Sequence, residues 1–188
     1  MMMQIVEALG VGPLVDEARP ADADNPRGYY ELAAVQSIAR ESGFLADASG
    51  RALKVVSPLL SRLPVRSPGA GYRVILMERD LDEVLSSQAA MLDRSGDATE
   101  RPPDEAMKRA FEGVHARALG WIEERADVKG WVVSHRELLA SPYLVVHRVA
   151  DFLGRAGNDR LLEQAASVVV PQLYRQRGSG SQTSAARW

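Results

Sequence analysis

The order of apolar and polar positions along the chain predicts helices that alternate with a few short strands. Residues 1–9 carry apolar side chains at helical spacing, and Gly10 and Gly12 end that pattern. Residues 31–46 are interpreted as a second helix that runs roughly to Gly43. The same spacing predicts four further helices, at residues 80–92, 105–125, 141–153 and 160–169.

Residues that favour helix ends mark two of these helices clearly. Asp80 is followed three residues later by Glu83, which is typical of a capping box at a helix start. Ser141 stands at the N-cap position, Pro142 at the first helical position and Gly154 just past the last. The helix from 142 to 153 is therefore bounded on both sides by local chemistry.

Three short apolar runs predict strands. Residues 52–56 form one run, which a serine and Pro58 close. Residues 74–77 are continuously apolar, as expected of a parallel strand buried on both faces, and residues 130–135 form a third strand. Strands that alternate with helices predict a parallel α/β sheet. Because three strands are few for such a sheet, we expect one strand to be missing from this pattern.

Composition limits the classes of protein that fit. The 188 residues suit one domain, 46% are hydrophobic, and the net charge is −2, so nothing favours nucleic acid or acidic membranes as a partner. The absence of cysteine excludes disulfides and thiolate chemistry and fits a reducing, cytoplasmic location. The apolar runs are too short to span a membrane. We expect residues 178–188, which are rich in glycine and serine, to be a flexible tail.

The carboxyl ends of parallel strands are where ligands bind in open α/β sheets, and this rule selects Arg79. Arg79 follows the second predicted strand, and Ser87 comes eight residues later on the next helix. An arginine fork and a serine hydroxyl near a helix start can together bind phosphate. Alternatively, Arg79 pairs with Asp82 or Glu83 and the serine lies on the ordinary helix surface, because charged helix starts are common.

Other candidates also have two interpretations each. Lys54 lies in an apolar run, where an ammonium group is costly unless it reaches solvent or serves a ligand. His135, at the end of the third strand, is either a structural histidine or a functional one. In the stretch "NPRGYYE", Tyr29 and Tyr30 suit a core position and Glu31 suits the first turn of a helix.

Taken together, these motifs resemble the bacterial sulfotransferases that use 3′-phosphoadenosine 5′-phosphosulfate (PAPS) as the donor. The resemblance is collinear and spans nearly the whole chain. Its most specific stretches are "DNPRGYYE" and "RDLDEVLSSQ". The other matching stretches are "MMMQIVEALG", "LKVVSPLL", "ELLASPYLVVHRVADFLG" and "VVVPQLYRQR".

The resemblance implies a helix-rich, three-layer α/β fold of P-loop-like type over residues 1–188. It also implies that Arg79 and Ser87 bind the donor's 3′-phosphate and that His135 lies near the adenine. The basic segment closing over the same phosphate contributes Arg175, Arg177 and Gly178. No metal is expected, because sulfuryl transfer in the family uses none.

The resemblance further implies that Lys54 neutralises charge on the bridging oxygen as the donor's bond to sulfur breaks. Many relatives carry a catalytic histidine two residues after that lysine, whereas this chain has Val56. Our hypothesis is that Glu31 is the general base instead. Residues that would shape the acceptor pocket are Arg27, Tyr29 and Tyr30. The acceptor is a small molecule, a lipid or a glycan.

One departure from the family bears on activity. The donor's phosphosulfate is normally held by a loop resembling "PRSGTS", which directly precedes the residues that match "MMMQ". We therefore expect the first strand and this loop to be absent from the sequence as given, and an upstream start is one explanation. The alternative function is a non-catalytic sulfotransferase-like remnant that acts as a binding or homo-oligomerising domain.

Overall fold

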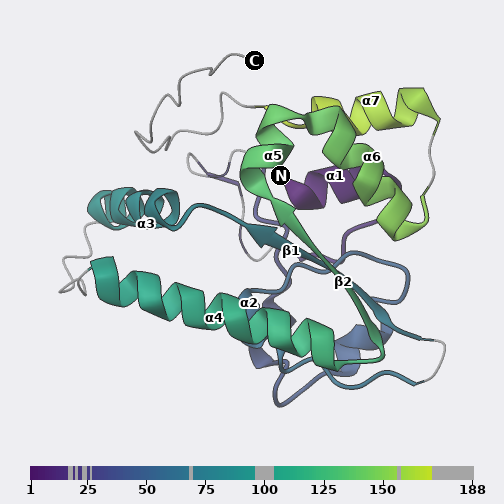
Figure 1. Ribbon diagram of the computed structural model, residues 1–188. Helices are drawn as coiled ribbons and strands as arrows, with labels where there is room; N and C mark the ends of the chain where they lie inside the picture. The colour runs from purple at the N-terminus through teal and green to yellow at the C-terminus, as the bar shows by residue number, and fades with distance from the viewer. Residues whose placement is uncertain are drawn as a thin grey trace, which may run out of the picture.

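Two parallel strands form the centre of the computed structural model, which describes residues 1–16, 19, 21–22, 25, 27–67, 70–95, 104–155 and 158–170. Strand β1 (Tyr72–Glu78) pairs with β2 (Val128–Ser134) in a register that runs from Tyr72 opposite Val128 to Glu78 opposite Ser134. Helices α3 (Leu81–Ser95) and α4 (Asp104–Glu124) lie between them in the sequence. The chain is thus a helix-rich α/β protein with a small parallel sheet (Figure 1).

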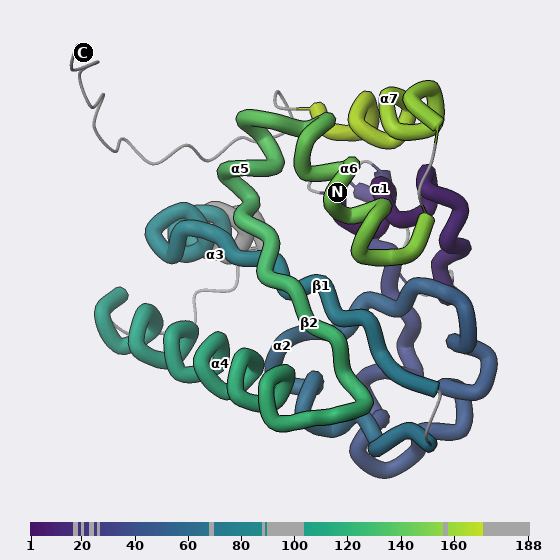
Figure 2. The backbone as a smooth tube through the Cα atoms, turned by 45° about the vertical axis from the view of Figure 1, so that its right-hand side comes forward, coloured from purple at the N-terminus to yellow at the C-terminus, as the bar shows by residue number. Residues whose placement is uncertain are grey.

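Four helices cover one face of the two strands. They are α1 (Met2–Ala8), α5 (His135–Ala140), α6 (Pro142–Leu153) and α7 (Asp159–Ser167), which Figure 2 shows gathered on one side of the strands. Their apolar stripes meet in one core with the inward side of β2, because a helix stripe must be buried against another element. Its most buried members are Ile5, Leu9, Val133, Leu138, Val145, Val146, Val149 and Ala165.

A second core lies on the opposite face of the strands. Helix α4 packs there with α2 (Ser57–Leu60) and with the 3₁₀ turns η1 (Ala33–Ser37) and η2 (Gly43–Ala46). The buried side chains of this core are Ile38, Leu45, Leu60, Leu63, Leu76 and Ala118. Strand β1 therefore contributes to cores on both of its faces, as the apolar run at residues 74–77 predicts.

The predicted helix ends are confirmed where local chemistry sets them. The Asp80 carboxylate accepts the backbone N–H groups of Asp82 and Glu83, at 2.9 and 3.3 Å, at the start of α3. Pro142 lies in the first turn of α6, and Gly154 ends that helix with φ of 67°, a left-handed conformation that glycine adopts without steric cost. Ser141 stands at the N-cap position, but its hydroxyl makes no capping hydrogen bond.

The helix predicted at residues 31–46 is wrong. The structure has two separate 3₁₀ turns, η1 and η2, with a break that includes Ser42 at φ of −120°. Ser42 and Gly43 both have low helix propensity, so the apolar residues on either side reach the core through two short turns. The Asp16 carboxylate accepts the N–H of Ala33 at 2.6 Å and fixes the start of the first turn.

The strand predicted at residues 52–56 is also wrong. Only Ala52 forms a β-bridge, with Pro13: its carbonyl accepts the N–H of Leu14, and its own N–H donates to the carbonyl of Gly12. The remaining residues run as extended chain into α2. Within the described ranges the sheet has two strands, so the wider three-layer sheet expected from the sequence is not seen there.

Helix α5 is an element that the sequence reading misses. Strand β2, the third strand predicted from the sequence, ends at Ser134, one residue before the predicted end. The Ser134 hydroxyl accepts the N–H of Glu137 at 3.3 Å. His135 is therefore the first residue of a helix that follows the strand directly. In the described part of the chain, no helix is both long and apolar enough to cross a membrane.

Arg125 joins the amino ends of the strands to the segment after α2. Its guanidinium donates to the Asp127 carboxylate, at 2.8 Å from Nε, and to the carbonyls of Leu63 and Pro64 at 2.7 and 2.8 Å. The same group lies 4.6 Å from the ring centroid of Trp121. Only 13% of the Arg125 side chain is exposed. Arg125 thus connects the end of α4 and the start of β2 to the segment that follows α2.

The close packing of α4 on β2 requires glycine at position 130. A Cβ atom there would lie 2.0 Å from Cγ2 of Ile122. We expect Gly130→Ala to lower the free energy of unfolding by about 1–3 kcal/mol, because overpacking forces the helix away from the strand. Urea unfolding of the purified variant measures this.

Gly120→Ala is the matched control for that experiment, since a Cβ on this α4 residue meets no atom within 4 Å. It is expected to raise the free energy of unfolding by about 0.5–1 kcal/mol, because alanine is the better helix former. Equal effects of the two substitutions would show that the α4–β2 contact is not as tight as described.

Candidate functional site

Arg79 and His135 lie side by side at the carboxyl end of the sheet. The last paired residues of the two strands are Glu78 and Ser134, and Arg79 and His135 follow them directly. Both strands point toward the side where α3 and α5 begin (Figure 1). Both side chains are half-buried, and the Nε atom of Arg79 is buried. The prediction that these two residues share one edge of a parallel sheet is confirmed.

Arg79 is the half-buried charged residue at this edge, next to His135. Burial lowers the pKa of Arg79, an effect that the charge of Glu83 opposes. Burial, then the charge of Arg79 and then that of the amino terminus lower the pKa of His135 to about 4. Because arginine stays protonated, the pair at pH 7 is a cation beside a neutral imidazole.

Lys54 brings a further positive charge to the same region. Burial, then Lys54 and then Arg27 lower the pKa of the Met1 amino group. The amino terminus, which also acts on His135, is therefore within electrostatic reach of Lys54 and of the Arg79 edge. An anion near the amino terminus would offset the positive charge that Lys54 and Arg27 exert there.

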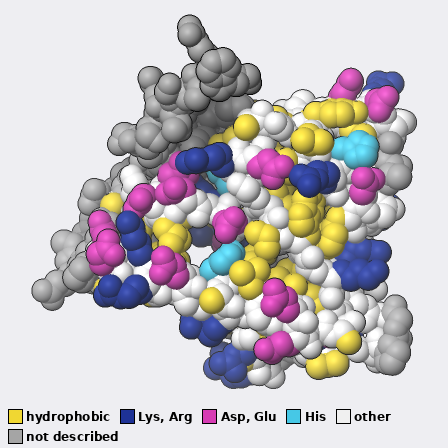
Figure 3. Space-filling view, in the orientation of Figure 1, with side chains coloured by type: hydrophobic (Ala, Val, Ile, Leu, Met, Phe, Trp, Pro, Cys, Tyr) yellow, Lys and Arg dark blue, Asp and Glu magenta, His cyan; other side chains and the backbone are white. Residues whose placement is uncertain are grey.

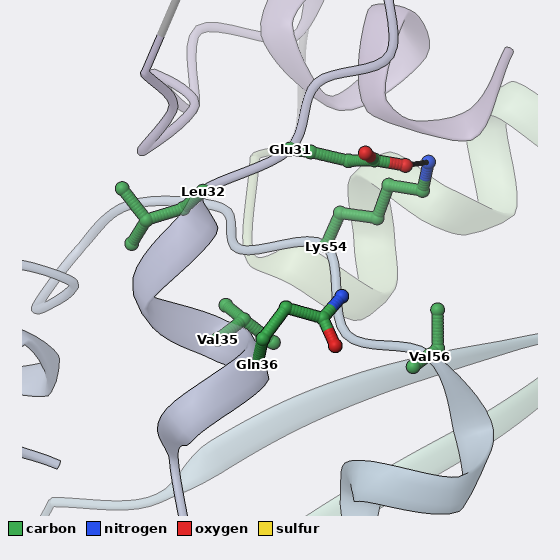
Figure 4. A pocket seen from close by; sticks show the side chains of 6 residues that line it. All are labelled: Glu31, Leu32, Val35, Gln36, Lys54 and Val56. Carbon is green, nitrogen blue, oxygen red and sulfur yellow. Dashed lines mark hydrogen bonds and ion pairs between the residues drawn. The ribbon is translucent and has the colours of Figure 1, made fainter. Parts of the chain in front are cut away.

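The Lys54 ammonium is held by two oxygen atoms. It donates to Oε1 of Glu31 at 2.9 Å and to the backbone carbonyl of Tyr29 at 3.0 Å. Figure 4 shows the two side chains reaching toward each other from separate segments. The side chains of Lys54 and Glu31 are each 37% exposed, so water reaches this ion pair.

Glu31 also contacts Arg19, whose Nη1 lies 3.6 Å from Oε2. The hydrogen bond from Lys54 lowers the pKa of Glu31, with smaller contributions from the charges of Lys54 and Arg19 and against the effect of burial. The carboxylate is consequently ionised at neutral pH and lies between two cations. A base with a lowered pKa is a weak proton acceptor while it stays in that position.

A small pocket opens beside this ion pair. It offers about 30 Å³ of free space, enough for one or two waters and far less than a nucleotide needs. The residues that line it are Glu31, Leu32, Val35, Gln36, Lys54 and Val56 (Figure 4). A larger ligand therefore has to bind partly over the open surface or separate these side chains.

The two tyrosines of "NPRGYYE" have well-defined partners. Tyr29 is 7% exposed, its hydroxyl donates to Asp22 at 2.6 Å, and the Arg19 guanidinium lies 3.4 Å above its ring. Tyr30 has φ of 54°, which is uncommon for a residue with a side chain. Its hydroxyl donates to Glu7 at 2.6 Å, and burial followed by this hydrogen bond raises the pKa of Tyr30 to about 12.

The remaining predicted site residues are spread more widely. Arg27 donates to the carbonyl of Val168 at 2.7 Å, at the end of α7, and Ser87 is half-buried in the second turn of α3. Arg175, Arg177, Gly178 and the expected tail 178–188 lie outside the described residues. Their roles stay predictions. In the described ranges, no three acidic or histidine side chains are placed to hold a metal ion.

Sequence reasoning misses Arg19 and the pairing of Glu31 with Lys54. Arg19 lies in a loop with no periodic pattern, and 23 residues separate Glu31 from Lys54. The only available signal is that an ammonium group in an apolar run needs a partner.

Comparisons of this chain with known protein families, curated proteins and solved structures found no match. The resemblance to sulfotransferases therefore stays a prediction that rests on the residues themselves.

The lowered pKa of His135 predicts a pH dependence of stability. The unfolded chain protonates this histidine near pH 6.5 and the folded chain near pH 4, so the unfolded state binds more protons in between. Stability is expected to fall as the pH is lowered from 6.5 to 4, and His135→Gln is expected to remove part of that slope. Urea unfolding at several pH values measures it. If stability depended on pH identically in wild type and His135→Gln, the pKa of His135 would not be lowered in the folded protein.

Proposed function

We propose that this chain binds PAPS at the carboxyl edge of its parallel strands and transfers the sulfuryl group to a hydroxyl or amine. The observation that supports this is the partly buried cation Arg79 beside neutral His135, together with the Lys54 ammonium, which acts on the amino terminus next to them. Arg79 lowers the pKa of His135 and Lys54 lowers that of the amino terminus, and a multiply charged anion would relieve that repulsion. A phosphosulfate donor with a 3′-phosphate is such an anion.

In this proposal the 3′-phosphate binds Arg79 at the start of α3, with the Ser87 hydroxyl as a second donor. An arginine fork makes paired hydrogen bonds to phosphate oxygens, and the first backbone N–H groups of a long helix add a positive field. Neutral His135 would stack on the adenine, since an uncharged ring suits an aromatic base. The proposal includes a wider P-loop-like sheet, which the parallel pairing of β1 with β2 and the cores on both faces of β1 support.

The transfer step follows from the groups around Lys54. The acceptor oxygen attacks sulfur while the bond from sulfur to the bridging phosphate oxygen breaks, which leaves 3′-phosphoadenosine 5′-phosphate (PAP). Lys54 neutralises the charge that develops on that leaving oxygen. Once the hydrogen bond between Glu31 and Lys54 is broken, the Glu31 carboxylate takes the proton of the acceptor hydroxyl. The acceptor lies over the small pocket, near the aromatic segment that includes Tyr29 and Tyr30.

A non-catalytic binding domain is the second candidate. The observation that favours it is the closed state of the site, where Glu31 already neutralises Lys54 and the adjacent pocket holds only one or two waters. Such a domain would bind the nucleotide or another anion and release it unchanged.

A transfer assay separates the two functions. Sulfur-labelled PAPS is incubated with the chain and with pooled phenols, alcohols, amines, lipids and glycans, and labelled products are separated from donor. Acceptor-dependent labelled product supports the sulfotransferase. Donor binding by equilibrium dialysis with no labelled product in any pool supports the binding domain. Absence of both donor binding and product rejects the sulfotransferase and a domain that binds this nucleotide.

A further inference from the structure

We infer that the Glu31 carboxylate occupies the Lys54 ammonium until an anionic ligand displaces it. The inference deepens the proposed function and rests on it for the identity of the natural anion. Displacement would give Lys54 to the ligand and leave Glu31 with Arg19. The Glu31–Lys54 ion pair would thus be exchanged for an anion–Lys54 contact each time the donor binds.

The contacts of the Lys54 ammonium fit such an exchange. Glu31 fills one of its positions at 2.9 Å, and the Tyr29 carbonyl fills another at 3.0 Å. The carbonyl belongs to a buried residue, whereas Glu31 is a partly exposed side chain that can rotate away. An incoming oxyanion can therefore replace the carboxylate while the carbonyl keeps the ammonium in place.

Arg19 can keep an ion pair with the Glu31 carboxylate after that carboxylate has left Lys54. Its guanidinium lies 3.6 Å from the second carboxylate oxygen and is stacked 3.4 Å over the Tyr29 ring. Tyr29 is itself anchored by its hydrogen bond to Asp22. The two cations bind different oxygens of one carboxylate, so losing Lys54 does not leave Glu31 without a positive neighbour.

The strength of the ion pair is in the range that permits exchange. Both side chains are 37% exposed, and ion pairs at such sites contribute little to stability. A dianion offers Lys54 more charge than one carboxylate does. A fully buried pair would resist exchange, because breaking it leaves an uncompensated charge.

This arrangement links donor binding to proton transfer. While Lys54 donates to Glu31, the carboxylate is a weak base. Once the donor occupies Lys54, that hydrogen bond is lost and Glu31 can accept the proton of an acceptor hydroxyl. The site would then become competent for transfer only after the anion has arrived.

Inorganic sulfate is the probe for this exchange. Isothermal titration of sulfate into the whole chain is compared for wild type, Glu31→Gln and Glu41→Gln, the last an exposed glutamate on the same segment. Without the competing carboxylate, Glu31→Gln is expected to bind sulfate up to about fivefold more tightly than wild type. Glu41→Gln should match wild type, and adding Lys54→Met to Glu31→Gln should abolish the gain.

A second pair of variants tests the role of Arg19. Arg19→Gln removes the second cation that the described residues place against Glu31, so sulfate should bind more weakly than to Arg40→Gln, which removes an exposed arginine elsewhere in the sequence. Equal sulfate affinity of wild type and Glu31→Gln overturns the inference, as does an equal gain in Glu41→Gln. PAP in place of sulfate separates the claims. A sulfate gain without PAP binding rejects the proposed donor and keeps the exchange.

Discussion

Replacing Lys54 by methionine is expected to lower the turnover number of sulfuryl transfer by about 100- to 1,000-fold, the usual loss when one group that stabilises transition-state charge is removed. Methionine keeps the length of the apolar stem and removes only the ammonium. The fall should appear mainly in kcat, because Lys54 acts on charge that develops as the bond to sulfur breaks.

Steady-state kinetics with labelled donor measure this effect, with Lys129→Met as the control. Lys129 is an exposed lysine at the amino end of β2, away from the edge that carries Arg79 and His135. Its replacement should leave kcat unchanged. If Lys54→Met keeps wild-type kcat while Lys129→Met does as well, Lys54 takes no part in the transfer step.

Arg125→Ala is expected to be the most destabilising single substitution among those considered, at about 2–4 kcal/mol. The substitution removes the guanidinium, whose N–H groups donate to the carbonyls of Leu63 and Pro64 and to the Asp127 carboxylate. It also removes the stacking on Trp121. The carbonyls and the carboxylate would lose their partners in a region where the arginine is mostly buried, and unsatisfied groups there are costly.

Thermal and urea unfolding measure this loss, with Arg109→Ala as the control. Arg109 is an exposed arginine on the same helix, α4, and its replacement should change the free energy of unfolding by less than about 0.5 kcal/mol. Equal stability of the two variants would contradict the role assigned to Arg125. Arg125→Lys should recover part of the loss, because it restores one charge but not the planar fork.

Short-range signals predict the parts of the fold that they determine. The positions of Pro142 and Gly154 define α6, and the continuous apolar run defines β1, because each depends on neighbouring residues alone. The run at residues 52–56 has the composition of a strand, but a strand also needs a partner along its length. The described structure gives it one bridge to Pro13. Composition cannot reveal whether a partner is present.

The helix predicted at residues 31–46 fails for a related reason. Its apolar residues are spaced for a helix, but they reach the core through two short turns once Ser42 and Gly43 break the backbone pattern. Charged and apolar side chains intermix on the face of the molecule that Figure 3 shows.

The candidate site was predictable as far as strand ends determine it. Arg79 and His135 follow from the rule that parallel strands end at one edge, and the register confirms it. The Glu31–Lys54 ion pair depends on how a loop folds over a distant segment, which no local pattern encodes. The turn at Tyr30, with its positive φ, is likewise a consequence of tertiary contacts such as the hydrogen bond to Glu7.

The most direct test of the nucleotide site is a calorimetric titration of PAP into this chain and into Arg79→Ala. Wild type is expected to bind, and Arg79→Ala to bind at least about 30-fold more weakly, because truncating one partner of a hydrogen-bonded charge pair typically costs 2 kcal/mol or more. Absence of binding by folded wild type, or equal affinity in both proteins, would contradict the assignment of Arg79 to the donor's phosphate.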